Sequence, residues 1–199
     1  YLNSALIEIY KGLVAKESDM SKFLRFAVLT LFILKSTSPI ASERSFLLNG
    51  IDSKVQISVP GKIDFVEPGD DIVNILDITD PANPVLAANL VLSNSLFGPP
   101  TNLQITPDES LALVTSAMKW EPNNDKWKPL PDNRLFIIDL EEKKPVLINT
   151  VEVGRQPSGI AISSSGRFAL IANRADKSVS VISIDGKVVN LVQTVPVDD

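Results

Sequence analysis

The sequence predicts an all-β fold built from a four-stranded unit that repeats about every 44 residues. The first observation behind this prediction is alternation of apolar and polar residues on both sides of a short polar turn, which is typical of antiparallel strand pairs. Three segments have this pattern: residues 72–92, 134–153 and 178–197. The second observation is that helical apolar spacing is absent from the sequence after Ser42.

A second shared unit fixes the length of the repeat. Residues 100–117 align with residues 157–174 at an offset of 57, whereas Asp139 and Ser183 of the strand pairs differ by only 44. The difference (57 minus 44) places 13 extra residues between Ala117 and Arg134. An uninterrupted period of about 44 residues that carries four strands indicates a β-propeller blade.

The amino-terminal segment has the order of a targeting sequence. Residues 1–19 begin with Tyr1 and are interpreted as upstream read-through, with Met20 as the true start. Two basic residues, an apolar run over 26–34 and a patch of small residues then predict a helical signal peptide over 20–42. The run is shorter than the roughly 20 residues that span a bilayer, so we expect no stable membrane span after signal cleavage. The expected location is periplasmic or extracellular, and an uncleaved amphipathic anchor is the alternative.

The remaining residues, 43–199, are predicted to form a partial propeller, an open arc of about three blades. The first blade covers about 45–97 and carries an insertion over 55–71. The second covers about 98–153 and contains the 13-residue insertion, and the third covers about 154–199 without interruption. Residues 106–109 and 164–167 are predicted hairpin turns, because Pro, Asp, Ser and Gly favour such connections.

Residues 154–184 carry a family resemblance. This stretch is similar to the YVTN-type repeat of bacterial β-propellers, which is grouped with the lactonase-like seven-bladed propellers. Of the name-giving Tyr-Val-Thr-Asn motif only Asn173 is kept, and Ser116 stands at that position in the earlier copy. The resemblance implies about seven blades, so the chain is expected to be the amino-terminal part of a longer propeller. The matching positions are Gly154, Pro157, Gly159, Ile160, Ala161, Gly166, Arg167, Ala172, Asn173, Arg174, Ser178, Val179 and Val181.

Composition excludes several kinds of site. The sequence has no His and no Cys, which rules out Ser-His-Asp triads, thiolate nucleophiles, disulfides and Cys-based zinc sites within this chain. A net charge of −5 argues against a nucleic-acid surface. Four acidic residues could offer oxygen ligands to calcium but lack the spacing of a calcium loop; they are Glu67, Asp70, Asp71 and Asp77. We therefore predict no catalytic residue, no metal site and no cofactor.

The insertion over 119–133 is the first candidate binding region. It contains Trp120 and Trp127, flanked by Lys and acidic residues, and is predicted to leave the sheet as a loop on one face. Indole rings beside charges could stack on a sugar or an aromatic ligand, or could contact a partner protein. The alternative is an elaborated hairpin whose indoles cover the edge of the blade.

Two arginines are further candidates. Arg155 precedes the first strand of the last blade, where its guanidinium could receive a carboxylate or a phosphate, and Arg174 follows the second strand. The alternative for both is a structural one, namely a salt bridge between blades or hydrogen bonds to loop carbonyls. Asn173 is predicted to bond to the backbone of a turn.

These features favour an exported repeat protein that acts as a scaffold for a small molecule or a protein partner, and not for nucleic acid. The resemblance implies an alternative, a lactonase-like enzyme (a lactone hydrolase or a lactonizing enzyme) whose key residues lie in missing blades. Such enzymes use His, Arg and Glu, of which this chain offers Arg155 and Glu152. A third hypothesis is a structural repeat protein of the cell surface.

Overall fold

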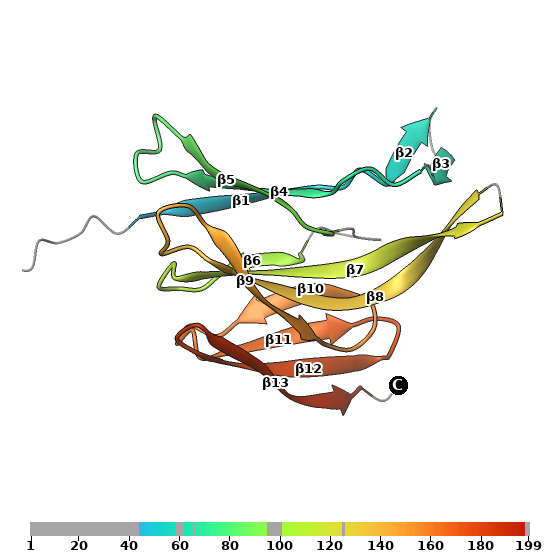
Figure 1. The fold of residues 1–199 in the computed structure, drawn as a ribbon. Coiled ribbons are helices and arrows are strands. Elements are labelled where there is room, and N and C mark those ends of the chain that lie inside the picture. The colour runs from blue at the N-terminus through green and yellow to red at the C-terminus, as the bar shows by residue number, and fades with distance from the viewer. Residues whose placement is uncertain (1–43, 59–61, 66, 95–100, 125, 198–199) are drawn as a thin grey trace, which may run out of the picture. The chain divides into compact units, whose positions relative to one another are not determined.

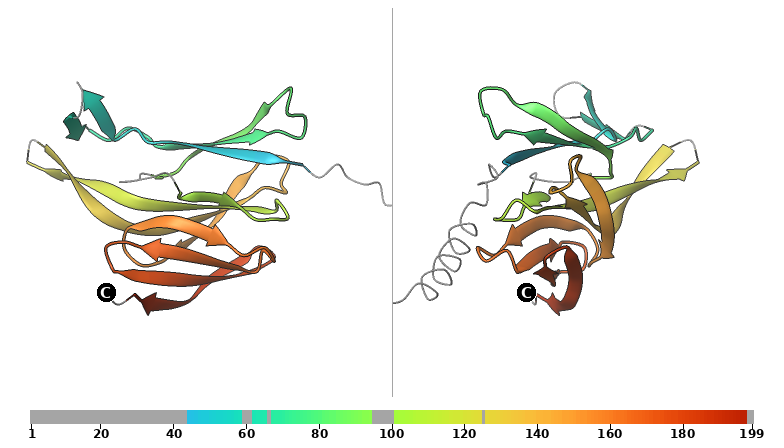
Figure 2. Two further views of the ribbon diagram at one scale, coloured as in Figure 1. Left: turned by 180° about the vertical axis from the view of Figure 1, so that it is seen from behind. Right: turned by 60° about the vertical axis from the view of Figure 1, so that its left-hand side comes forward.

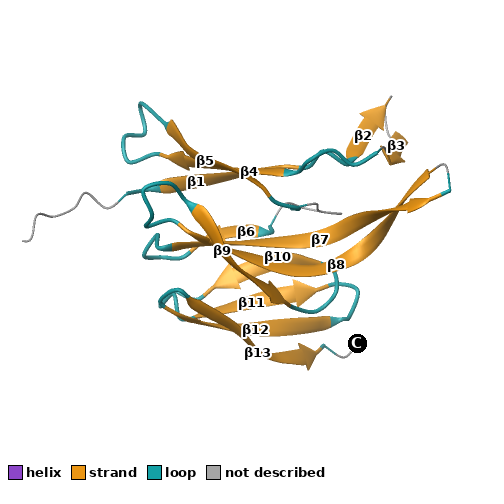
Figure 3. Ribbon diagram, viewed as in Figure 1, coloured by secondary structure: helices purple, strands orange, loops and turns teal. Residues whose placement is uncertain are grey.

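The computed structural model describes residues 44–58, 62–65, 67–94, 101–124 and 126–197, and it describes side chains in these ranges outside 55–66. Every regular element in this part of the chain is a β-strand (Figure 3). The expected read-through over 1–19 and signal peptide over 20–42 lie outside the described residues. A search of the described part for a helix with the length and apolarity to cross a bilayer finds none.

Three antiparallel sheets follow one another along the chain (Figure 1). The first has the order β1 (Phe46–Ile51), β4 (Ile72–Asp77), β5 (Val85–Val91), and a separate hairpin of β2 (Val55–Ser58) and β3 (Lys62–Phe65) lies between β1 and β4 in sequence. The second sheet consists of β6 (Leu103–Ile105), β7 (Leu111–Asn123), β8 (Lys126–Asp139) and β9 (Val146–Glu152). The third consists of β10 (Pro157–Ile162), β11 (Phe168–Asn173), β12 (Ser178–Asp185) and β13 (Val188–Pro196).

The predicted fold class is confirmed, because the second and third sheets have the same order of four sequential strands, as consecutive propeller blades do. The first sheet differs from the expected four strands. Phe46 of β1 pairs with Asp77 of β4 as Leu111 of β7 pairs with Asp139 of β8, so β1 is the equivalent of β7. Among the described residues, the first sheet therefore has no counterpart of β6.

The core lies between neighbouring sheets. Successive side chains of a strand point to opposite faces, so β7 contributes to two clusters at once. Ala112 and Val114 pack against first-sheet residues such as Val73, whereas Leu111 and Leu113 pack against third-sheet residues such as Ile171. The middle sheet is thus apolar on both faces, which explains why β7 begins with a continuous apolar run.

The two predicted hairpin turns are confirmed. The Glu109 N–H donates to the Thr106 carbonyl at 2.9 Å, and the Gly166 N–H donates to the Ser163 carbonyl at 2.9 Å. Glu109 has a φ of 55°, although it is not glycine. Its carboxylate accepts a hydrogen bond from the N–H of Phe46 at 2.7 Å, so this turn also ties the second sheet to the first.

Candidate functional site

The 13-residue insertion extends a hairpin and does not form a loop. Strands β7 and β8 stay paired up to Asn123 and Lys126, beyond a register shift between Ser116 and Met118. The expectation of a loop was wrong because it was inferred from the presence of an insertion, which does not show whether the two halves of the insertion pair with each other. Prolines are tolerated here because the pairing of β6 with β7 ends at Val114, and that of β9 with β8 ends at Arg134, so past these points β7 and β8 pair only with each other. Two views agree that this hairpin extension reaches beyond the ends of β11 and β12 (Figures 1 and 2).

The two tryptophans lie on one face of the hairpin extension. Trp120 is opposite Pro129 and only 8% exposed, and it belongs to a cluster with Ala117 and Met118. Trp127 packs against this cluster and is half-buried. The structure therefore agrees with the alternative expectation for Trp120, a packed indole on an elaborated hairpin. A part of Trp127 stays accessible, and its role in binding stays a prediction.

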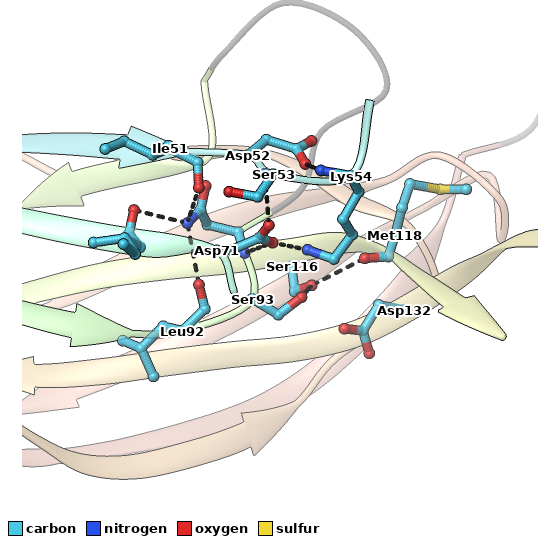
Figure 4. A network of polar contacts seen from close by, with 12 residues as sticks. Ile51, Asp52, Ser53, Lys54, Asp71, Leu92, Ser93, Ser116, Met118 and Asp132 are labelled. Carbon is cyan, nitrogen blue, oxygen red and sulfur yellow. Dashed lines mark hydrogen bonds and ion pairs between the residues drawn. The ribbon is translucent and has the colours of Figure 1, made fainter. Parts of the chain in front are cut away.

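A buried ion pair lies at the base of the hairpin extension (Figure 4). The Asp71 carboxylate, with a side chain that is 0% exposed, pairs with the Lys54 ammonium and also accepts the N–H groups of Ser53 and Asn94, both at 3.0 Å. The Lys54 nitrogen lies 5.7 Å from the centre of the Trp120 ring, a cation–π distance. Burial lowers the pKa of Lys54, and the nearby Asp52 carboxylate opposes this shift.

Sequence reasoning missed Lys54, because a single lysine between two short strands belongs to no recognisable pattern. Asp71 was weighed as a calcium ligand, but the structure commits its carboxylate to Lys54 and two backbone N–H groups. Among the described residues, no three acidic side chains come together in a group that could hold a metal ion.

A second charged pair, Asp132 and Arg134, lies on β8 at the base of the hairpin extension. Arg134 donates from Nε and Nη2 to Asp132 Oδ2 at 2.9 and 2.6 Å, and the Asn133 N–H donates to Oδ1 at 2.8 Å. Ser116 Oγ, at the register shift of β7, lies 2.9 Å from Ser93 Oγ of the first sheet. Burial alone would raise the pKa of Asp132, but hydrogen bonds from Arg134, Ser116 and Asn133 together hold it below its ordinary value.

This lowered pKa predicts a loss of stability in acid. A carboxyl whose pKa is lower in the folded state stabilises the fold above the unfolded value of 3.8, and that contribution disappears as the pH falls through the folded pKa. We expect the free energy of unfolding, measured by urea titration across the acid range, to fall less steeply in Asp132→Asn than in the wild type. Glu142→Gln, at an exposed position, is the control. Equal acid sensitivity of wild type and Asp132→Asn would contradict the prediction.

The predicted Arg155 site contains an ion pair within the third sheet. The Arg155 backbone N–H and Nε donate to the two oxygens of Asp176 at 2.7 and 2.6 Å, and these hydrogen bonds lower the pKa of Asp176. The side chain of Arg155 is nevertheless 65% exposed. Its partner comes from the β11–β12 connection of the same blade, whereas the structural alternative expected a partner across blades or a loop carbonyl.

Arg174 lies in the neighbouring loop. Its N–H donates to the Gln156 carbonyl at 3.0 Å, which brings the loops of Arg155 and Arg174 together. Arg174 also lines a shallow groove of about 370 Å³ with Lys177 and Val179. The structure thus brings the loops of Arg155 and Arg174 together, and it brings Trp120 and Trp127 together. Among the contacts found in the described part of the chain, none connects the arginine loops to the tryptophans.

The expected role of Asn173 was wrong. Asn173 was predicted to bond to the backbone of a turn, but its Nδ2 donates to the hydroxyls of Ser178 and Ser180 at 3.1 and 2.9 Å. The backbone of Gly154 approaches so closely that a Cβ atom there would lie 2.4 Å from Asn173 Cγ. The close approach accounts for glycine at position 154.

Comparison with known proteins leaves the family open. No family model matches the chain, and no curated protein is similar to it in sequence. Among solved structures it is similar to a protein of unknown function from Desulfotomaculum acetoxidans (16% identity, TM-score 0.46, 62% of this chain and 34% of that chain). It is also similar to a candidate 6-phosphogluconolactonase from Bacteroides fragilis (12%, 0.45, 68% and 42%). A third similar structure is a dihydro-haem d1 dehydrogenase (24%, 0.46, 75% and 29%).

The chain thus spans less than half of the length of each of these three proteins. With TM-scores of 0.45 to 0.46, these similarities support no conclusion about function. The fold class is therefore assigned from the order of the strands in each sheet and from the packing between neighbouring sheets.

Proposed function

We propose that the chain is an exported β-propeller repeat protein that acts as a scaffold and binds a small molecule or a partner protein through the β7–β8 hairpin extension. Export is inferred from the signal-like order of residues 20–42. The observation that supports binding is the packing at the base of this hairpin, where Trp120 lies beside the ammonium of the buried Lys54–Asp71 ion pair and Asp132 pairs with the partly exposed Arg134 within β8. A surface that is held rigid loses little conformational entropy when a ligand binds.

The chemistry of the hairpin extension suits recognition. Lys119, Glu121 and Lys128 are exposed, and Lys119 pairs with Glu121 at 3.0 Å. Trp127 adds a partly accessible indole beside these charges. Tryptophan is enriched among the residues that dominate binding energy, and its ring can stack on a sugar or an aromatic side chain.

The test is a selection of ligands followed by a point substitution. The purified full chain is screened against an array of oligosaccharides and a library of displayed random peptides. We expect ligands from at least one set to bind the wild type, and to bind Trp127→Ala at least about tenfold more weakly. The matched control is Phe168→Ala, which removes another partly exposed aromatic ring, on the third sheet.

A second variant shows whether a loss of binding comes from the missing hairpin extension or from misfolding of the chain. Residues 117–133 are replaced by residues 174–177, which connect the equivalent strands of the third sheet. A preserved far-UV β signal with loss of the selected ligands supports the proposal. Ligands that bind Trp127→Ala and this exchange as well as they bind the wild type would contradict it.

A further inference from the structure

The hairpin extension has a basic face on the side opposite to its two tryptophans. Trp120 is opposite Pro129 in the register, and successive side chains of a strand point to alternate faces. The residues next to these two positions on β7 and β8 therefore share the other face. The charged residues of this basic face are all exposed, and they are Lys119, Glu121, Lys126 and Lys128.

Positive charge dominates the basic face among the described residues. Lys119 forms an ion pair with Glu121 at 3.0 Å, and these two side chains are 47% and 52% exposed. In the described part of the chain, Lys126 and Lys128 have no acidic side chain within ion-pair distance, so their ammonium groups are available to a ligand. Because the whole chain has a net charge of −5, the basic face differs in sign from the rest of the molecule and attracts anions.

The edge of β8 beside the basic face is unsuited to the addition of another strand. β9 pairs with β8 only as far as Arg134, so the earlier residues of β8 have no second partner strand among the described residues. Pro129 and Pro131 on this stretch have no N–H, so a peptide cannot continue the ladder of hydrogen bonds along it. The hairpin extension also reaches beyond the ends of β11 and β12 (Figures 1 and 2), where the third sheet does not stack on it.

Trp127 lies on this edge between Lys126 and Lys128. It is half-buried, so part of its indole stays accessible, and its two neighbours in β8 are exposed on the opposite face. A ligand that follows the edge meets the indole on one side and the two ammonium groups on the other. An indole stacks on the face of a sugar ring, and ammonium groups pair with carboxylates.

We propose that this edge of the hairpin extension binds an acidic polysaccharide, a chain of sugar residues that carry carboxylates. The proposal rests on the proposed function, because it names the class of ligand that the hairpin extension binds. Carboxylates of the polymer pair with Lys126 and Lys128, and one sugar ring stacks on Trp127. The prolines of the edge favour a polysaccharide over an extended peptide, since a peptide added to a strand edge binds through backbone hydrogen bonds.

The test measures binding of polygalacturonate, a polymer of uronic acid residues, to the purified full chain by isothermal titration calorimetry. We expect the wild type to bind it, with an affinity that falls as the salt concentration rises, because salt screens exposed charges. The methyl-esterified polymer has the same sugar backbone without the charges. It should bind at least about tenfold more weakly, because the lysines lose their partners.

Two double variants show where the polymer binds. Lys126→Glu/Lys128→Glu should weaken binding of polygalacturonate at least about tenfold, because repulsion replaces two attractions. Lys143→Glu/Lys144→Glu changes the net charge by the same amount in the exposed β8–β9 connection, at the other end of β8, and should bind as the wild type does. Far-UV circular dichroism checks that both double variants fold.

Several results would overturn the proposal. They are no binding of polygalacturonate by the wild type, equal binding of the esterified polymer, and equal losses in the two double variants. Binding of polyglutamate or of phosphatidylglycerol vesicles as tight as that of polygalacturonate would also overturn it, because these probes carry negative charge without sugar rings. Selected ligands that need the hairpin extension but carry no negative charge would overturn this proposal and leave the proposed function intact.

Discussion

Replacing Asp71 with Ala is expected to lower the free energy of unfolding by about 3–5 kcal/mol, because the substitution leaves the Lys54 ammonium buried without its carboxylate. The side chains of Lys54 and Asp71 are 9% and 0% exposed, so water cannot easily take the place of the missing partner. Two backbone N–H groups, of Ser53 and Asn94, also lose their acceptor. Urea unfolding followed by tryptophan fluorescence measures the loss.

Two further variants separate the ion pair from other effects of the substitution. Asp70→Ala changes an exposed neighbouring carboxylate and should alter the free energy of unfolding by less than about 0.5 kcal/mol. The double variant Lys54→Met/Asp71→Leu should recover a large part of the loss, because a buried ion pair replaced by apolar groups is often close to neutral. A loss below about 1 kcal/mol in Asp71→Ala would show that the pair is not buried as described.

Replacing Leu113 with Ala is expected to cost about 2–5 kcal/mol of the free energy of unfolding, because it opens a cavity between the second and third sheets. Leu113 is 0% exposed and belongs to the cluster that includes Ile171 and Ile182. Leu170→Ala, at the equivalent position of the third sheet, is the matched control. Leu170 is 49% exposed, so we expect its replacement to cost less than about 1 kcal/mol.

Both variants and the wild type are measured under the same conditions. Far-UV circular dichroism during urea unfolding follows the sheets. Equal losses in the two variants would mean that the two equivalent leucines are equally buried. That outcome would contradict the stacking of the sheets in the order described.

The positions of the sheets could be predicted from the sequence because strands have a period of two residues, and each repeat keeps this alternation. The segment over 134–153 contains the end of β8 and all of β9, and the segment over 178–197 contains β12 and β13, as alternation and turn residues predicted. The three-stranded first sheet was not predictable, since the apolar pattern of β1 does not show which strands pair with it. The β7–β8 hairpin extension agrees with the alternative expectation, an elaborated hairpin, and not with the expected loop, because prolines are compatible with loops as well as with unpaired strand edges.

The candidate site could be predicted only in part. The two tryptophans stood out by residue type, and the structure does bring them together. Lys54 and Asp71 are 17 residues apart, and Arg155 and Asp176 are 21 apart, with no periodic pattern that links them. Such pairs form where the ends of strands from different parts of the chain meet. Local alternation specifies the face of each residue but not which polar ends become neighbours.

Hydrogen exchange of the backbone amides over 118–130 is the most direct test of the claim that packing against the buried Lys54–Asp71 ion pair holds the hairpin extension rigid. We predict slow exchange of these amides in the wild type, in contrast to the fast exchange expected of a surface loop. In Asp71→Ala, exchange of this segment should accelerate while the amides of β11 and β12 keep their protection. Fast exchange of residues 118–130 already in the wild type, or the same protection in Asp71→Ala as in the wild type, would contradict the claim.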